Sequence, residues 1–303
     1  MKAAIYFNEL QPLLYGYYIC KGVIFLHRKI SAAVFTVLTA MFMCGCTSDK
    51  NTVGQSAGHN DRGGVMPAET AFLTDGKEKV CYGQGYETDS DNRPVGAIQA
   101  QEKYGSYGGR FIFGKDDKTI RLTFDEGYEN GCTGKILDIL KKKKVTATFY
   151  VTLDYVKSSP ELVSRMINEG HEVGNHSCTH PSLPDISDDT VFEEIHGLET
   201  YISDNFGGYK TVTMRPPRGE FSVRTLRIAK NMGYDTVLWS FAYNDWNTDA
   251  QPDRDTAYRR ITSATHNGAV YLLHAVSETN TAILPDVIDY WLDNGYTVKS
   301  ISG

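Results

Sequence analysis

The sequence has no surplus of positive charge. Its 303 residues contain 31 Lys and Arg against 37 Asp and Glu, so the formal net charge is −6. A protein that binds nucleic acid neutralises phosphates with a basic surplus, and this balance therefore argues against a nucleic-acid partner. The run Lys141–Lys144 is a local exception, which we interpret as the solvated end of a helix, where cations suit the helix dipole.

Cysteines are too few and too irregularly placed for a disulfide framework. The chain has six, and three of them fall near the N-terminus, at Cys20, Cys44 and Cys46. The remaining three, Cys81, Cys132 and Cys178, are an odd number with no spacing pattern. The sequence therefore predicts a fold that is held by its core rather than by disulfides.

The apolar run "ISAAVFTVLTAMFM" (Ile30–Met43) is too short to span a bilayer comfortably, and basic residues precede it, as in the h-region of a signal. The following "MCGC" resembles the cleavage box of bacterial lipoproteins, with Cys46 as the acylated residue and Met43 where Leu is usual. This resemblance predicts a lipid anchor and export to the extracytoplasmic face of the membrane. An ordinary cleaved signal and an uncleaved anchor are the alternatives.

Four parts are expected along the chain. Residues 1–46 form the leader, and because residues 1–26 fit no part of a signal, we expect translation to start further downstream. A polar, glycine-rich linker covers 47–70. Residues 71–109, rich in Gly, Tyr and polar side chains, are predicted to be an extended lead-in, and 110–303 form the main domain, where strands alternate with helices.

Seven strand-like runs appear at 119–124, 147–152, 172–175, 211–215, 235–239, 269–273 and 296–301. Helix-like stretches lie between them, at 133–143, 159–169, 188–205, 222–231, 254–265 and 280–293. Alternation of this kind predicts right-handed βαβ units and a parallel sheet. Periodicity alone leaves two α/β architectures open, a closed barrel and an open, doubly wound sheet.

In either architecture, function gathers at the carboxyl ends of the strands. The polar residues that look out of place all fall at those ends: Asp125 and Glu126, His176 and His180, Arg215, Asp245, and His274. "NHSCTH" holds two imidazoles four residues apart in a loop or single turn, since Pro181 disfavours helix. Alone this motif would indicate two surface histidines. With the carboxylate pair it has the composition of a catalytic zinc site, in which Cys178 is expected to point elsewhere.

"TFDEG", "HSCTH", "RPPRG", "DW" and "LLH" resemble, in order and spacing, the motifs of the polysaccharide deacetylases, carbohydrate esterase family 4. The resemblance covers about residues 110–303 and implies a distorted (β/α) barrel with seven parallel strands. "TFDEGYENG", "HPSLPD" and "RPPRGEFS" are more narrowly similar to the branch that de-N-acetylates muramic acid on the way to muramic δ-lactam in spore cortex.

The resemblance also implies roles. Asp125 matches the catalytic base, Arg215 the arginine that orients it, His274 the general acid and Asp245 the residue that tunes the acid. A divalent metal, zinc or another transition metal, is expected on His176, His180 and Glu126, which takes the place of the family's metal-binding Asp. Arg218, where many members have an aromatic residue, and Trp246 are expected to bind substrate.

The expected function is metal-dependent removal of acetyl groups from N-acetylmuramic acid in the peptidoglycan glycan strand. No protein partner is implied. One alternative is an N-acetylglucosamine deacetylase acting on peptidoglycan or a chitin-like glycan. The other is a pseudoenzyme that only binds glycan, although the presence of Asp125 and His274 argues against it.

Overall fold

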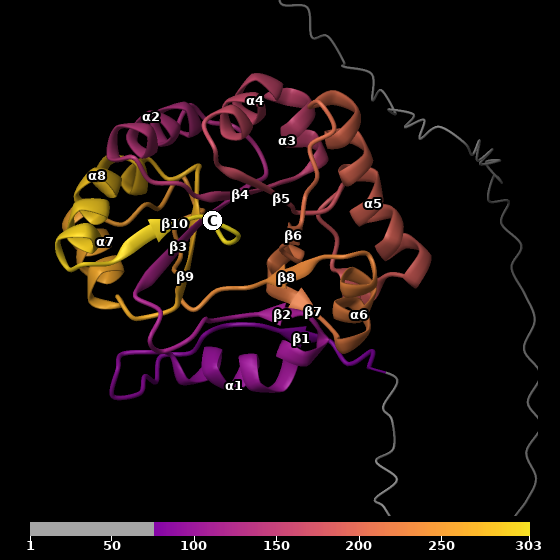
Figure 1. Ribbon diagram of the computed structural model, residues 1–303, viewed down its shortest axis with the longest axis horizontal. Coiled ribbons are helices and arrows are strands. Elements are labelled where there is room, and N and C mark those ends of the chain that lie inside the picture. The colour runs from indigo at the N-terminus through magenta and orange to yellow at the C-terminus, as the bar shows by residue number, and fades with distance from the viewer. Residues whose placement is uncertain (1–75) are drawn as a thin grey trace, which may run out of the picture. The chain divides into compact units, whose positions relative to one another are not determined.

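The structure is a computed structural model that describes residues 76–303 (Figure 1). The predicted signal, the linker and Cys46 lie outside the described residues. The main sheet is parallel throughout, with the order β10-β3-β4-β5-β6-β8-β2 and with β9 beside β3. Its strands are β2 (Gly109–Arg110), β3 (Thr119–Glu126), β4 (Thr148–Val151), β5 (Glu172–Asn175), β6 (Thr213–Met214), β8 (Asp235–Val237), β9 (Ala269–His274) and β10 (Thr297–Lys299).

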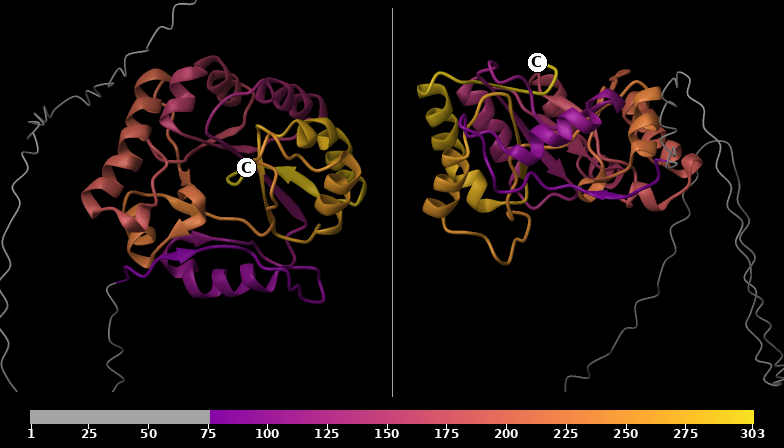
Figure 2. Two further views of the ribbon diagram at one scale, coloured as in Figure 1. Left: turned by 180° about the vertical axis from the view of Figure 1, so that it is seen from behind. Right: turned by 90° about the horizontal axis from the view of Figure 1, so that it is seen from below.

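Helices surround this sheet on its outer side, as Figures 1 and 2 show. They are α1 (Val95–Tyr104), α2 (Thr133–Lys143), α3 (Leu153–Ser158), α4 (Pro160–Asn168), α5 (Asp188–Asn205), α6 (Val223–Asn231), α7 (Arg254–Ser263) and α8 (Glu278–Asp293). All seven predicted strands and all six predicted helices are present, with ends that differ by a few residues. The helix α3 was not predicted. It has only 6 residues between β4 and α4, which is too short for a helical periodicity to be recognised.

The sheet curls into a distorted barrel. β9 pairs with β3 from Ile120 to Asp125, and Phe241, beyond the end of β8, bridges Tyr271 on β9. These two contacts bring the chain after β8 back to β3, so the barrel is the correct one of the two predicted architectures. The distortion lies at β3, where β10 pairs with Thr119–Arg121 and β4 with the following residues, Thr123–Glu126.

The prediction of an extended lead-in was wrong in part. It contains the helix α1, whose buried residues Ala97, Ala100 and Tyr104 are spaced as one face of a helix. Glycine and tyrosine are frequent in this segment and obscured that spacing. The lead-in runs along one flank of the barrel with α1 on its outer side (Figures 1 and 2).

The lead-in is fastened to the barrel by strand pairing and by packing. Its strand β1 (Val80–Cys81) pairs antiparallel with β7 (Glu220–Phe221), and the Tyr82 hydroxyl donates to the carbonyl oxygen of Trp239 at 2.6 Å. Tyr82 also packs edge-on against the fully buried Phe111. Lead-in and barrel therefore share a hydrophobic core, and the described residues, 76–303, belong to one compact unit.

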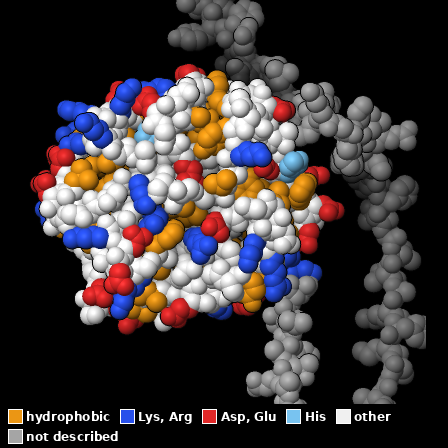
Figure 3. All heavy atoms as spheres, in the orientation of Figure 1, with side chains coloured by type: hydrophobic (Ala, Val, Ile, Leu, Met, Phe, Trp, Pro, Cys, Tyr) orange, Lys and Arg blue, Asp and Glu red, His pale blue; other side chains and the backbone are white. Residues whose placement is uncertain are grey.

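Surface features agree with the composition. Lys141–Lys143 occupy the last turn of α2, where they were expected. On the face seen in Figure 3, Lys and Arg side chains are scattered among acidic and neutral ones rather than gathered in a basic stripe. Within residues 76–303, no disulfide joins the cysteines, and no helix combines the length and apolar composition that crossing a membrane requires.

Candidate active site

Six of the predicted site residues line one pocket of about 790 Å³ at the carboxyl ends of the strands. They are Asp125, His176, His180, Arg218, Trp246 and His274. We call this cavity the catalytic pocket. Two more predicted residues, Arg215 and Asp245, lie behind its wall and contact residues that line it. The parallel sheet therefore brings together side chains that are up to 149 residues apart in the sequence (274 − 125).

Asp125 is held by a buried arginine. Arg215 has no exposed surface, and its Nη1 donates to Asp125 Oδ1 at 2.8 Å. Its other donors are used as well, since Nε and Nη2 donate to the carbonyl oxygens of Val237 and Leu238, each at 3.1 Å. Burial would raise the pKa of Asp125, but the charge and hydrogen bond of Arg215, with a further contribution from His274, lower it. The pocket therefore contains an oriented carboxylate that favours its ionised form.

His274 is paired with a buried aspartate. Its Nδ1 lies 2.7 Å from Asp245 Oδ1, and its backbone N–H donates to Asp245 Oδ2 at 2.9 Å. Burial would lower the pKa of His274, but the hydrogen bond and negative charge of Asp245 raise it, with a further contribution from Asp125. His274 therefore favours its protonated form, opposite in sign to Asp125.

Two residues that support Asp245 were not predicted. Asn280 Nδ2 donates to Asp245 Oδ2 at 2.6 Å, and the Tyr243 hydroxyl donates to Asn280 Oδ1. Asn280 is buried at the start of α8, where its own N–H is capped by Ser277. A polar residue on the inner face of a helix can indicate a supporting role of this kind. The sequence predicts a helix that begins at Asn280, where a polar residue is ordinary, whereas α8 begins at Glu278.

The HSCTH segment is a loop, as predicted, with a strained backbone. Ser177 and His180 have φ angles of 69° and 58°, in the left-handed region. The loop is fixed by Asn175, whose side-chain oxygen accepts from Ser177 N, and by Ser177, whose hydroxyl accepts from His180 N. His176 and His180 thereby face each other with ring centroids 4.9 Å apart.

Both loop histidines favour the neutral form. Burial lowers the pKa of His176, and burial with the adjacent His176 lowers the pKa of His180 to about 4. His176 Nδ1 lies 2.8 Å from the carbonyl oxygen of Arg215, which leaves Nε2 directed towards Asp125 Oδ2 at 3.6 Å. A neutral imidazole anchored through one nitrogen is the form that ligates metals.

The predicted set of three metal ligands does not assemble in this structure. Glu126 has no exposed surface and lies with its carboxyl 3.3 Å from the Thr133 hydroxyl, away from the two histidines. β3 extends through Asp125 to Glu126, and successive side chains of a strand point to opposite faces, so only Asp125 reaches the pocket. Burial and the charge of Glu129 raise the pKa of Glu126 well above its usual range.

This geometry corrects the expected cofactor site. Among residues 76–303, no group of three or more His, Cys, Asp or Glu side chains is arranged to hold a metal ion. His176 and His180 are suitable donors, but Glu126 does not complete the set. The residues present therefore do not fit the expected zinc site in this conformation.

Arg218 lies at the rim of the catalytic pocket with a φ of 61°. Its exposed side chain has no carboxylate within ion-pair distance among the described residues. Lys79 of the lead-in explains this, since its Nζ lies 2.8 Å from Asp185 and 3.0 Å from Glu220. These two acids, whose pKa values the charge of Arg218 also helps to lower, are thus already paired with Lys79.

Aromatic side chains form the rest of the pocket. Trp246 was expected to bind substrate, and it lines the pocket with 57% of its surface exposed, as does Tyr128 with 54%. Trp239 is buried beneath the loop that contains Gly219. The two residues pack so closely that a Cβ atom on residue 219 would lie 2.6 Å from the Trp239 ring. Tyr128 and Trp239 were not predicted, because neither belongs to a motif with an obvious chemical role.

The residues considered structural lie elsewhere. His171 accepts a hydrogen bond from Ala147 N, and His266 contacts the Ser240 hydroxyl. Cys178 directs its Sγ towards the carbonyl oxygen of Glu193 on α5, away from the two histidines, as expected. The geometry thus groups eight of the nine predicted residues within 76–303, while their individual roles stay predictions.

Comparison with known proteins agrees with this geometry. Residues 114–237 match the family model described as polysaccharide deacetylase. The chain is 44% identical over 200 residues to the peptidoglycan-N-acetylmuramic acid deacetylase PdaA of Bacillus subtilis, covering 66% of this chain and 75% of that protein. An uncharacterized 30.6 kDa protein of Geobacillus stearothermophilus is 42% identical over 218 residues, which cover 72% of this chain and 82% of that protein.

The same relationship appears among solved structures. The structure of Bacillus subtilis PdaA, a family 4 carbohydrate esterase, matches with a TM-score of 0.71 and 39% identity, covering 75% of this chain and 96% of that chain. Sequence, fold and pocket geometry thus lead to one conclusion. The chain belongs to the polysaccharide deacetylase family, carbohydrate esterase family 4, and is a hydrolase that acts on amide bonds.

Proposed function

We propose that the protein removes the acetyl group from N-acetylmuramic acid residues of peptidoglycan. One observation supports the chemistry above all others. Asp125 and His274 are directly opposed residues on the neighbouring strands β3 and β9, and both face the catalytic pocket. Arg215 favours a negative charge on the first and Asp245 a positive charge on the second. A base and an acid are therefore ready on one pocket wall.

Amide hydrolysis uses this pair in sequence. Asp125 takes a proton from a water molecule as the water oxygen bonds to the acetamido carbonyl carbon. The C–N bond of the tetrahedral intermediate then breaks as His274 gives its proton to the departing amine, which yields acetate and the free amino sugar. Asp245 stabilises the imidazolium before that transfer.

The developing oxyanion needs a donor close to Asp125. Pro216 and Pro217 follow Arg215 and have no N–H, so the first backbone donor in this loop belongs to Arg218. The left-handed conformation of Arg218 turns this short loop sharply at the pocket rim. We infer that the backbone N–H of Arg218 donates a hydrogen bond to the oxyanion, while the Arg218 side chain binds the substrate.

Muramic acid differs from glucosamine by a lactyl ether, which ends in a carboxylate once the stem peptide has been removed. A guanidinium can bind a carboxylate through two parallel hydrogen bonds. Arg218 is suited to this contact because it is exposed at the pocket and because Lys79 pairs with Asp185 and Glu220. This supports muramic acid as the substrate and, beyond it, a role in forming muramic δ-lactam in spore cortex.

We propose that the enzyme acts at the extracytoplasmic face of the membrane, anchored by a lipid on Cys46. The support is the signal-like region and the "MCGC" sequence alone. Labelled fatty acid should be incorporated by the wild type and not by Cys46→Ser, and incorporation by both would exclude this anchor.

The decisive experiment compares two substrates. The purified protein is incubated with muropeptides from which the stem peptide has been stripped and with intact ones, and acetate loss is followed by mass. We expect the stripped substrate to lose one acetyl group from each muramic acid residue. Loss from N-acetylglucosamine residues alone would contradict the proposal.

A further inference from the structure

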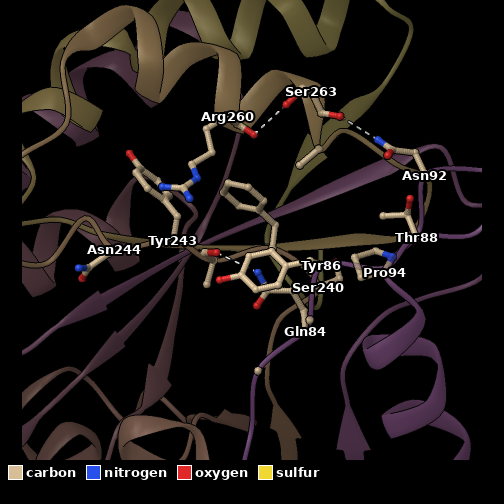
Figure 4. A pocket seen from close by; sticks show the side chains of 15 residues that line it. Gln84, Tyr86, Thr88, Asn92, Pro94, Ser240, Tyr243, Asn244, Arg260 and Ser263 are labelled. Carbon is tan, nitrogen blue, oxygen red and sulfur yellow. Dashed lines mark hydrogen bonds between the residues drawn. The ribbon is translucent and has the colours of Figure 1, made fainter.

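A second pocket, of about 810 Å³, adjoins the catalytic pocket. Its walls come from the lead-in at Gly83–Tyr86, from the loop Ser240–Asn244 and from α7 (Figure 4). We call it the flank pocket. Ala242 and Tyr243 line both pockets, so the two pockets adjoin at these residues.

The flank pocket has an arginine suited to an anion. Arg260 extends from α7 towards Tyr243, with its guanidinium carbon 5.6 Å from the centre of the tyrosine ring (Figure 4). Its side chain is exposed, and among the described residues no carboxylate lies within ion-pair distance of it. Each of the two adjoining pockets is thus lined by one arginine that lacks an acidic partner, Arg218 in the first and Arg260 in the second.

The opposite wall offers a surface for a sugar ring. Tyr86 is fully exposed and stands at the pocket between the lead-in and the loop (Figure 4). An exposed aromatic ring can cover the apolar face of a pyranose at little cost in side-chain entropy. Gly83 and Gly85 precede it in the chain, and a Cβ at either would meet nothing within 4 Å, so this part of the wall is bare backbone.

The walls are held in place by the barrel. Gln84 Nε2 donates to the carbonyl oxygen of Ala242 at 2.9 Å, while Trp239 Nε1 donates to Gln84 Oε1 at 3.0 Å. Asn92 donates to the carbonyl oxygens of Ser263 and Thr265 near the end of α7. The pocket is therefore preformed by hydrogen bonds that tie the lead-in to two other segments.

We propose that the flank pocket is a second carbohydrate subsite, which binds a muramic acid residue further along the same glycan strand. Its free lactyl carboxylate pairs with Arg260 and its ring packs on Tyr86. The inference rests on the proposed function. A peptide-stripped strand carries a carboxylate on every second sugar, and the paired, adjoining pockets provide a repeated cation for that repeated anion.

The test compares peptide-stripped glycan strands that differ in length. Arg260→Ala removes the cation, and Gly83→Trp fills the pocket at a position whose φ is not left-handed and where side-chain space is open. The matched controls are Arg259→Ala, one residue away on α7 and outside the pocket, and Gly114→Trp, which has the same open surroundings elsewhere. KM and kcat are measured for each, together with the Kd of a fluorescently labelled long strand.

Wild type should show a lower KM for long strands than for short ones. Arg260→Ala and Gly83→Trp should each raise the KM and the Kd for long strands roughly tenfold, with kcat and short-strand kinetics unchanged, while both controls behave as wild type. Equal KM and Kd in wild type, Arg260→Ala and Gly83→Trp would overturn the subsite. Absence of acetate release by wild type from every strand would overturn the proposed function instead, and the Kd values would still decide the subsite.

Discussion

The catalytic pocket and the flank pocket meet at Tyr243, but they are built on different principles. In the catalytic pocket, Arg215 and Asp245 are fully buried and fix the charge of the group in front of each. In the flank pocket, Arg260 and Tyr86 are exposed and touch no charged partner among the described residues. Catalysis requires charges that are fixed in a buried environment from which water is excluded. Substrate recognition can use side chains that are still exposed to water.

The most severe test of this contrast is Asp125→Asn. The amide keeps the size of the carboxylate but cannot accept the proton of the attacking water, so kcat should fall by about 10²–10⁴-fold. Kinetics of acetate release measure the loss, and binding of labelled glycan should be retained because the flank pocket is untouched. Residual activity near that of wild type would remove Asp125 as the base.

Asp245→Asn should produce a smaller loss with a diagnostic pH dependence. His274 is protonated below its pKa, which Asp245 raises, so activity is present at lower pH and is lost as the pH rises through that raised value. Without the Asp245 charge, burial lowers the pKa of His274, and the loss should occur at lower pH. The pH profile of kcat/KM shows this shift, and an unchanged alkaline limb would contradict the assignment of His274 as the acid.

Arg218→Ala should affect one substrate only. Loss of a charge-assisted pair costs about 1.5–3 kcal/mol, so kcat/KM on peptide-stripped muramic acid residues should fall roughly tenfold to a hundredfold. On N-acetylglucosamine oligomers the change should be slight. An equal loss on both substrates would assign Arg218 to the structure of the loop.

Lys79→Met should weaken the same preference by a smaller factor. With Lys79 gone, Glu220 and Asp185 become available to Arg218, and an exposed pair of this kind changes binding by about twofold to fivefold. The double variant Lys79→Met with Glu220→Gln should recover part of the activity on muramic acid. No change in either variant would show that the lead-in has no influence on Arg218.

Glu126→Gln should have the smallest effect. The carboxyl is buried against Thr133 and favours its neutral form, which a Gln side chain imitates, so activity should stay within about twofold of wild type. Metal content of the purified variant, measured alongside activity, is the second readout. Joint loss of metal and activity would show that Glu126 is a ligand after all.

Strong local patterns predicted the alternating strands and helices and most of the site, whereas the barrel was predicted by the family resemblance and not by periodicity. Buried strands read as continuous apolar runs, and polar residues at their ends stand out, as Asp125 and His274 do. Glu126 was misplaced because its position depends on where β3 ends, and strand ends are decided by tertiary contacts. Asn280 was missed for a related reason, since a polar residue in a helix is ordinary until its buried partner is known.

The flank pocket could not have been predicted from the sequence. Its parts come from three segments, and none carries a chemical motif. Arg260 is one of several arginines on α7, and Tyr86 is one of several tyrosines in the lead-in. The antiparallel pairing of β1 with β7 helps to bring the lead-in to the barrel, and a strand of two residues, Val80 and Cys81, is hard to recognise in a sequence.

That pairing also has a consequence for the order of folding. Val80 pairs with Phe221, and Tyr82 bonds to Trp239 across 157 residues of chain, so the lead-in is made first but has no place to dock until most of the barrel exists. Contacts so distant in sequence form late, because the entropy lost in closing a long loop must be offset by other contacts. We therefore expect newly made chains to pair β3 with β4, its neighbour in the sequence, before the lead-in contacts form. Hydrogen exchange during refolding should show protection of β3 and β4 before protection of the Tyr82 amide, which donates to the carbonyl oxygen of Gly219.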